Sequence, residues 1–293
     1  MNLSVIILSY AVDDEVYRMN CCCLDSLFAS EQWADGELEV LLMESNRNAT
    51  YQYDTRVRVV IPEEKFGFHR FFNIGLQHTT GQFVAFCNND IVFTPGWWSA
   101  ILCVKEKHPK FMCFSPLDRS YPMMTEEEMP STNDYYIGWE NKRHFAAWCF
   151  VWEKKVFDLI GKFDEVFDFY SADDDELMTL QKYCIPNVLV TNSEVKHLSQ
   201  IVTKKVGINK YKVIDKVQYP LSKKEMSRGL TWLWDDVRFY KAYRCMEMKW
   251  GNERMLKRIH RLLNKCPFLR KRFITRTLYN KNIVNLLAKL TGI

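Results

Sequence analysis

The sequence predicts an α/β protein built on an open sheet. Through the first two hundred residues, short apolar segments of strand length alternate with segments whose apolar residues recur at helical spacing. The first apolar segment, LSVIIL at residues 3–8, is unbroken, which is typical of a parallel strand buried on both faces. In such sheets ligands bind beyond the carboxyl ends of the strands, so the residues that follow each strand are the first candidates for a site.

Two more strands and a helix follow in the first sixty residues. Residues 13–28 fit a helix because Val16 and Leu27, among others, fall on one helical face. The run LEVLLM at 38–43 is a second buried strand, and the alternating run RVRVVI at 56–61 is a third.

The pattern then continues to residue 143. A helix is expected at 70–78, and QFVAFC at 82–87 is a fourth strand. A Pro-Gly turn precedes a helix at 97–108. Residues 116–143 are polar and rich in Pro, Met and Glu, which predicts a long loop that covers a site as a lid.

The next segments complete the sheet. FAAWCFVW at 145–152 is a buried strand, and a short helix begins at Val156 and ends at Ile160. A helix at 173–182 opens with carboxylates, as the positive end of its dipole favours. A short strand at 188–190 is the last one expected.

The charge divides the chain near residue 200. Residues 201–293 hold 23 Lys/Arg and 6 Asp/Glu, a balance of +17, whereas residues 1–200 balance at −13. We therefore predict an α/β domain at 1–200 and a basic, largely helical region at 201–293. Two apolar helical stripes are expected there: Met255, Ile259, Leu262, Leu263 and then Ile283, Val284, Leu286, Leu287, Leu290. This excess of cations indicates an anionic partner, either nucleic acid or an anionic membrane surface.

Composition excludes several other classes of protein. No apolar run approaches the roughly 18 residues that span a bilayer, and the first residues lack the features of a signal peptide. The ten cysteines include no C-x-x-C pair, so zinc is not expected and the thiols are read as reduced. The sequence predicts a soluble, cytoplasmic protein and indicates no protein partner.

Three polar clusters lie where predicted strands and helices meet. Asn88-Asn89-Asp90 follows the fourth strand, where a carboxylate can hold a cation on a diphosphate, although an Asx-rich turn explains the same residues. The acids at 173–176 suit either helix capping or a general base. His197 follows the last strand and gains interest only from the other two clusters.

In this order the segments resemble family-two glycosyltransferases. LSVIILSY, KFGFHRFFNIGL, TTGQFVAFCNND and the TPGWW turn resemble the nucleotide-binding half of these enzymes. The segment from FAAWCFVW to VLVTNSEVKHL resembles their acceptor half. The resemblance implies the GT-A fold, a Rossmann-like architecture, and inverting sugar transfer from a nucleotide-diphosphate donor, expected to be a UDP-sugar, with Mn²⁺ or Mg²⁺. Around NNDIVF and the acidic run the chain is similar to phage-encoded members.

The resemblance also implies roles for individual residues. Asp90 and His197 would hold the cation, and Asp174, with Asp173 as its partner, would be the general base. The D-D-D-E run leaves open whether Asp173 or Asp175 takes the role of Asp174. The residues implied in nucleotide-sugar binding are Tyr10, Glu44, Arg70, Asn73, Asn88 and Asn89.

The acceptor is the least determined part of this prediction. One hypothesis is a hydroxymethylated pyrimidine of phage DNA, flipped toward the base while Arg270, Lys271 and Arg272 bind phosphates. The alternative is a lipid-linked or surface glycan at an anionic membrane, with the protein peripheral to it. Trp148 can stack on an acceptor sugar or belong to the core. A third reading is a degenerate binding module without activity.

Overall fold

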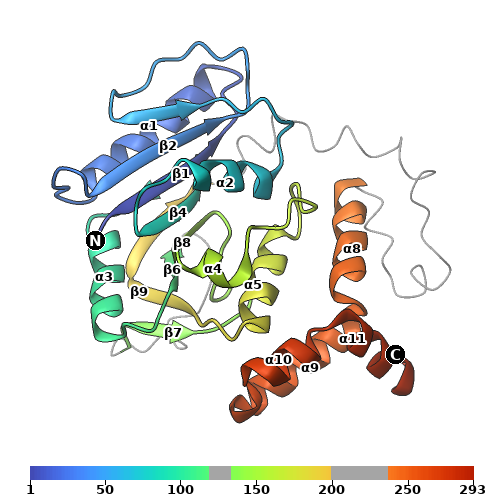
Figure 1. Ribbon diagram of the computed structural model, residues 1–293. Coiled ribbons are helices and arrows are strands. Elements are labelled where there is room, and N and C mark those ends of the chain that lie inside the picture. The colour runs from blue at the N-terminus through green and yellow to red at the C-terminus, as the bar shows by residue number, and fades with distance from the viewer. Residues whose placement is uncertain (119–132, 199–236) are drawn as a thin grey trace. The chain divides into compact units, whose positions relative to one another are not determined.

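The computed structural model describes residues 1–118, 133–198 and 237–293 (Figure 1). The middle of the predicted loop, 119–132, and the start of the basic region, 199–236, lie outside the described residues. The chain divides into two compact units. The first takes in the described residues of Met1–Glu165 and Ile185–Val202, and the second those of Val166–Cys184 and Thr203–Ile293.

The first unit is built on one mixed sheet, which confirms the predicted α/β class. Its strands are β1 (Leu3–Ser9), β2 (Leu38–Glu44), β3 (Val57–Val60), β4 (Phe83–Asn88), β5 (Ile91–Phe93), β6 (Cys113–Asp118), β7 (Tyr135–Ile137), β8 (Cys149–Glu153) and β9 (Asn187–His197). The strand order is β3-β2-β1-β4-β8-β6-β9-β5, with β7 also paired to β9. The first four strands run parallel, and β8 joins them antiparallel to β4. Their carboxyl ends therefore meet at one edge.

Helices cover both faces of this sheet. Helices α1 (Asp14–Ala29) and α3 (Trp97–Lys107) share a core with the alternate β4 residues Phe83, Ala85 and Cys87. On the opposite face lie α2 (Phe68–Gln77) and the short α4 (Val156–Ile160). An aromatic cluster fills that side, in which the ring of Phe86 lies 5.1 Å from Phe72 and 4.9 Å from Phe150.

Two glycines have clear steric reasons. A Cβ at Gly75 would lie 2.8 Å from Cγ2 of Ile6, so only glycine lets α2 approach β1 this closely. Gly96 has φ of 81° at the start of α3, in the left-handed region where glycine is favoured. These contacts give the predicted N-x-G and Pro-Gly segments a structural basis.

The second unit is helical. Its helices are α5 (Ala172–Lys182), α8 (Val237–Trp250), α9 (Glu253–Lys265), α10 (Arg272–Leu278) and α11 (Lys281–Leu290). Trp250, Met255, Ile259, Leu263 and Val284 form its core. Contacts from α5 to α10, and of α11 with α8 and α9, complete the unit.

Several sequence predictions need correction. Residues 133–143 are not all loop, because β7 lies there, and β6 extends into the segment at 116–118. The strand expected at 145–152 begins only at Cys149, β5 was not expected, and β9 is much longer than 188–190. Three members of the predicted apolar stripes face solvent instead of the core: Leu262, Leu286 and Leu290.

Candidate active site

A buried polar network lies at the carboxyl ends of β1 and β2. The carboxylate of Glu44 is 1% exposed and accepts hydrogen bonds from Ser9 Oγ at 2.6 Å and from the backbone N–H of Asn46 at 2.7 Å. The backbone N–H of Ala11 also points at it, 3.1 Å from Oε1. Glu44 thus fixes the loop after β1. The predicted contact of Glu44 with a nucleotide sugar stays a prediction.

The same network extends to the end of β4 through Asn20 of α1. Asn89 donates to Asn20 Oδ1 at 2.6 Å, and Asn20 donates to Ser9 Oγ and to the Tyr53 hydroxyl, both at 2.8 Å. Burial raises the pKa of Tyr53 to about 12, so its hydroxyl stays protonated at neutral pH. The amide of Asn89, predicted to bind the nucleotide sugar, is buried and donates into this network.

Strand pairing brings three predicted site residues together next to that network: Asp90, Trp148 and His197. The β4–β8 ladder continues to Asn88, whose N–H donates to the Trp148 carbonyl at 2.9 Å. The β5–β9 ladder places His197 opposite Ile91, beside Asp90. As a result, Nε2 of His197 lies 3.1 Å from Oδ1 of Asp90. The Trp148 ring stacks on the His197 ring, with centroids 4.8 Å apart and an interplanar angle of 6°.

The Asp90–His197 pair fits a divalent cation. Two ligands about 2.1 Å from an octahedral cation and at right angles lie about 3 Å apart, which matches the measured 3.1 Å. Oδ1 of Asp90 is buried and forms no hydrogen bond with a described residue. Among those residues no cluster of three His, Cys, Asp or Glu side chains could hold a metal, so substrate phosphates and water would complete the coordination.

Tyr10 and Asn88 lie at the ends of β1 and β4. Tyr10 is 38% exposed, which leaves its ring available to a flat ligand such as a base. Asn88 is half-buried, and its side chain forms no hydrogen bond with a described residue. Both residues therefore remain compatible with the predicted contact to a nucleotide sugar.

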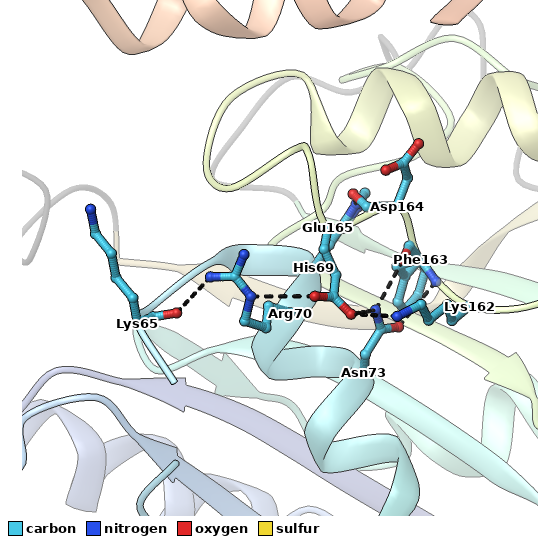
Figure 2. Close-up of polar contacts among 8 residues, drawn as sticks. All are labelled: Lys65, His69, Arg70, Asn73, Lys162, Phe163, Asp164 and Glu165. Atoms are coloured by element: carbon cyan, nitrogen blue, oxygen red, sulfur yellow. Dashed lines mark hydrogen bonds and ion pairs between the residues drawn. The ribbon is translucent and has the colours of Figure 1, made fainter. Parts of the chain in front are cut away.

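Arg70 and Asn73 on α2 bind the loop at 162–165 instead of standing free (Figure 2). The Asn73 amide donates to the Phe163 carbonyl at 2.9 Å and accepts from the Phe163 N–H at 3.0 Å. Arg70 Nε lies 3.3 Å from Glu165 Oε2, and its NH1 donates to the Lys65 carbonyl at 2.8 Å. Asn73 therefore holds the loop at 162–165, and its predicted role in donor binding stays a prediction.

Glu165 is the centre of this loop contact. It accepts from Lys162 at 2.8 Å and from Asn73 at 3.1 Å, in addition to Arg70. The bond from Lys162, followed by those from Asn73 and Arg70, lowers the pKa of Glu165. Next to it, the buried His69 donates from Nδ1 to the Asp164 carbonyl at 2.8 Å (Figure 2). Three α2 side chains thus hold the loop.

The four acids of α5 belong to the second unit and differ in exposure. Asp173 and Asp174 are half-buried, whereas Asp175 is 3% and Glu176 1% exposed. Burial, followed by repulsion from the three aspartates, raises the pKa of Glu176 well above its ordinary value. Glu176 therefore retains its proton to a higher pH than an ordinary glutamate does.

Asp175 is engaged by α8. Its Oδ1 accepts from Trp250 Nε1 at 2.7 Å, and Lys249 Nζ lies 2.8 Å from the same carboxylate. A carboxylate held by a buried indole and an ammonium is a poor general base, since both contacts favour its charged, unprotonated form. This removes Asp175 from the three candidates and leaves Asp173 and Asp174.

The three predicted cationic acceptor residues have different surroundings. Lys271 and Arg272 are exposed. Arg270 is half-buried and donates to the Leu263 carbonyl at 3.2 Å and to Oδ1 of Asn264. Burial lowers its pKa. Arg270 therefore stabilises the turn after α9, and its predicted contact with an acceptor stays a prediction.

Sequence reasoning missed Ser9, Asn20 and Tyr53 in the network, as well as Trp250 beside the acids. Each is a single polar or aromatic residue in an ordinary strand, loop or helix, so no local pattern distinguishes it. The only available signal was that Ser9 ends a strand at the edge where ligands bind.

Residues 23–163 match the family model described as Glycosyl transferase family 2. This segment of the chain is therefore similar to the family-two glycosyltransferases. No curated protein matches the chain.

Similar solved structures show that the chain has the predicted GT-A fold. GalNAc-T7 with UDP, GalNAc and Mn²⁺ is 15% identical with a TM-score of 0.55, covering 68% of this chain but only 43% of its own. The mannosyltransferase PcManGT from Pyrobaculum calidifontis, in complex with GDP-Man and Mn²⁺, is 13% identical with a TM-score of 0.50 and covers 99% of this chain and 87% of its own. S. aureus TarS 1-349 is 12% identical with a TM-score of 0.53 and covers 100% and 92%.

No helix among residues 1–118, 133–198 and 237–293 combines the length and the apolar character needed to cross a bilayer.

Proposed function

We propose that the protein transfers a sugar from a nucleoside-diphosphate donor to a hydroxyl acceptor, with inversion and with a divalent cation. The observation that carries this proposal is the Asp90–His197 pair, 3.1 Å apart at the ligand-binding edge of a family-two domain. Such a pair supplies one oxygen and one nitrogen ligand, and the two phosphates of a donor supply further oxygen ligands.

Donor binding is assigned to the residues around this pair. Asp90 and His197 hold Mn²⁺ or Mg²⁺, which when bound neutralises charge on the leaving diphosphate. Trp148 keeps the His197 ring in its plane by stacking on it. The exposed ring of Tyr10 stacks on the base, which we propose is uracil, and Asn88 contacts the nucleotide sugar.

Asp174 is proposed as the general base. Inverting transfer needs one group to take the proton of the acceptor hydroxyl as it attacks the anomeric carbon, and no enzyme nucleophile. Asp174 is half-buried, in contrast to Asp175 and Glu176, and its backbone N–H donates to Asp173 Oδ1 at 3.0 Å. Asp173 thereby supports the start of α5 as its partner.

The experiment measures release of UDP from UDP-sugars without an acceptor, with Mn²⁺ and with a chelator. Metal-dependent release is expected from the wild type, and Asp90→Asn should reduce it about a hundredfold or more. Asp54→Asn is the matched control, because Asp54 is an acid in an exposed pair with Arg56. Absence of metal-dependent release from a panel of UDP- and GDP-sugars would instead favour a non-catalytic sugar-binding module.

A further inference from the structure

We infer that the corner between α9 and α10 docks on a membrane surface that carries anionic lipids. This α9–α10 corner consists of residues 261–276, which include the end of α9, a short turn and the start of α10 (Figure 1). The inference rests on the exposure and the charge of the side chains in this segment.

The apolar side chains of the corner are unusually exposed. Phe273 is 82% exposed, Phe268 72% and Leu262 46%. They are not needed for the core of the second unit, because Ile259 and Leu263 on the same helix are buried in it. Removing one such side chain from water is favourable by about 1.5–3 kcal/mol of free energy. The exposure of these side chains therefore indicates a surface that binds a partner.

Cations surround these apolar residues. Five exposed cations lie in the corner: Arg261, Lys265, Lys271, Arg272 and Arg276. No acidic residue occurs after Glu253. Among the described residues, none forms an ion pair with any of these five exposed cations. Near an anionic lipid surface each such cation contributes about 1 kcal/mol of binding energy.

The combination favours lipid over nucleic acid as the partner. Cations bind the phosphates of either one, and phenylalanine rings can also stack on bases. Aliphatic side chains do not stack on bases as aromatic rings do, yet Leu262 in the corner and Leu286 and Leu290 on α11 are also exposed. The boundary between lipid headgroups and acyl chains accepts aliphatic and aromatic side chains alike.

If the proposed sugar transfer is correct, docking of the corner would make a lipid-linked hydroxyl the acceptor class. That step rests on the proposed function, whereas membrane binding itself does not. The two are measured separately, since vesicle binding needs no donor and UDP release needs no vesicle.

The test is co-sedimentation of the full chain with vesicles of phosphatidylcholine alone, or of phosphatidylcholine and phosphatidylglycerol in equal parts. We expect binding only to the anionic vesicles. The double variant Phe268→Ser/Phe273→Ser should bind the anionic vesicles at least about tenfold more weakly than the wild type does. Lys271→Ser/Arg272→Ser should lose about tenfold or more as well. Ile61→Ser, which removes an apolar side chain 46% exposed in the first unit, should bind as the wild type does.

Two results would overturn the inference. One is anionic-vesicle binding that the phenylalanine double variant retains in full, because the apolar side chains would then take no part. The other is salt-sensitive binding to duplex DNA with no binding to vesicles. The latter would assign the basic corner to nucleic acid and restore hydroxymethylated pyrimidine DNA as the acceptor to pursue.

Discussion

Four adjacent acids at the start of α5 have two kinds of surroundings. Asp175 and Glu176 are buried, and Asp175 is bound by Lys249 and Trp250. Asp173 and Asp174 are half-buried. The packing of α5 therefore leaves Asp173 and Asp174 as the acids that can take a proton from an acceptor. We assign this role to Asp174.

Asp174→Asn tests this assignment directly. Turnover should fall about a hundredfold or more, because the amide cannot accept the proton of the acceptor hydroxyl. Donor affinity should stay unchanged, since Asp174 is assigned no contact with the nucleotide. Steady-state transfer and calorimetric donor binding measure the two quantities.

Asp175→Asn is the matched control in the same helix. It leaves the Lys249 ammonium without its carboxylate, so the free energy of unfolding should fall by about 1–3 kcal/mol in urea titration. A full loss of turnover in Asp175→Asn, with stability retained and Asp174→Asn active, would move the base to Asp175.

Glu176 predicts a pH dependence of stability. The unfolded chain releases this proton near the ordinary pKa of 4.5, whereas the folded chain retains it to higher pH because its pKa is raised by burial. Above the ordinary value the unfolded state therefore binds fewer protons, and stability falls by up to about 1.4 kcal/mol per pH unit until the folded group ionises.

Glu176→Gln removes this proton exchange. Relative to the wild type, the variant should become more stable as the pH rises from about 5 to about 7, as measured by urea unfolding at both values. A stability difference that stays constant between the two pH values would mean that Glu176 has an ordinary pKa in the folded protein.

The roles of these acids could be predicted only in part. The run of acids, its place at a helix start and its resemblance to a family motif were all visible in the sequence. The partners that separate Asp175 from Asp174 lie 74 and 75 residues further along the chain. No local pattern connects residues that far apart.

At the scale of elements, a buried ion pair joins α3 to the end of β8. Lys105 Nζ lies 2.9 Å from Glu153 Oε1, with side chains 7% and 2% exposed. Lys105 also donates to the carbonyls of Pro109 and Phe111, both at 2.8 Å. All the donors of this ammonium are thus directed at oxygen atoms of the core.

Lys105→Met should lower the free energy of unfolding by about 3–5 kcal/mol, because it leaves the Glu153 carboxylate buried beside fewer cations. The control is Lys107→Met on the same helix, whose pair with Asp134 is exposed and contributes less than about 1 kcal/mol. Chemical denaturation of both variants measures the difference. Equal effects would contradict a special role for the buried pair.

Strands were predicted correctly where they consist of a continuous run of apolar residues. They were missed where only pairing with another strand distinguishes them. β1, β2 and β4 are continuous apolar runs and were expected near their observed bounds. β5 has only three residues, and the second half of β9, TNSEVKH, is polar. Both exist through their mutual antiparallel pairing, which is a long-range contact that no periodicity reveals.

At the scale of the whole molecule, the asymmetry of charge is clear from the sequence, but the division into units is not. We predicted a boundary at residue 200, whereas α5 clusters with the C-terminal helices. The contacts of Asp175 with α8, and the hydrogen bond of Gln181 with His260 at 2.8 Å, explain this grouping. The acidic start of α5 thus has its partner, α8, within the basic unit itself.

The central claim is that Asp90 and His197 hold the cation on which donor binding depends. The most direct test is calorimetric titration of UDP into the full chain, with and without Mn²⁺. We predict that Mn²⁺ raises the UDP affinity of the wild type and leaves that of Asp90→Asn and His197→Ala unchanged. An equal gain from Mn²⁺ in the wild type and in both variants would contradict the account, because the cation would then be bound elsewhere.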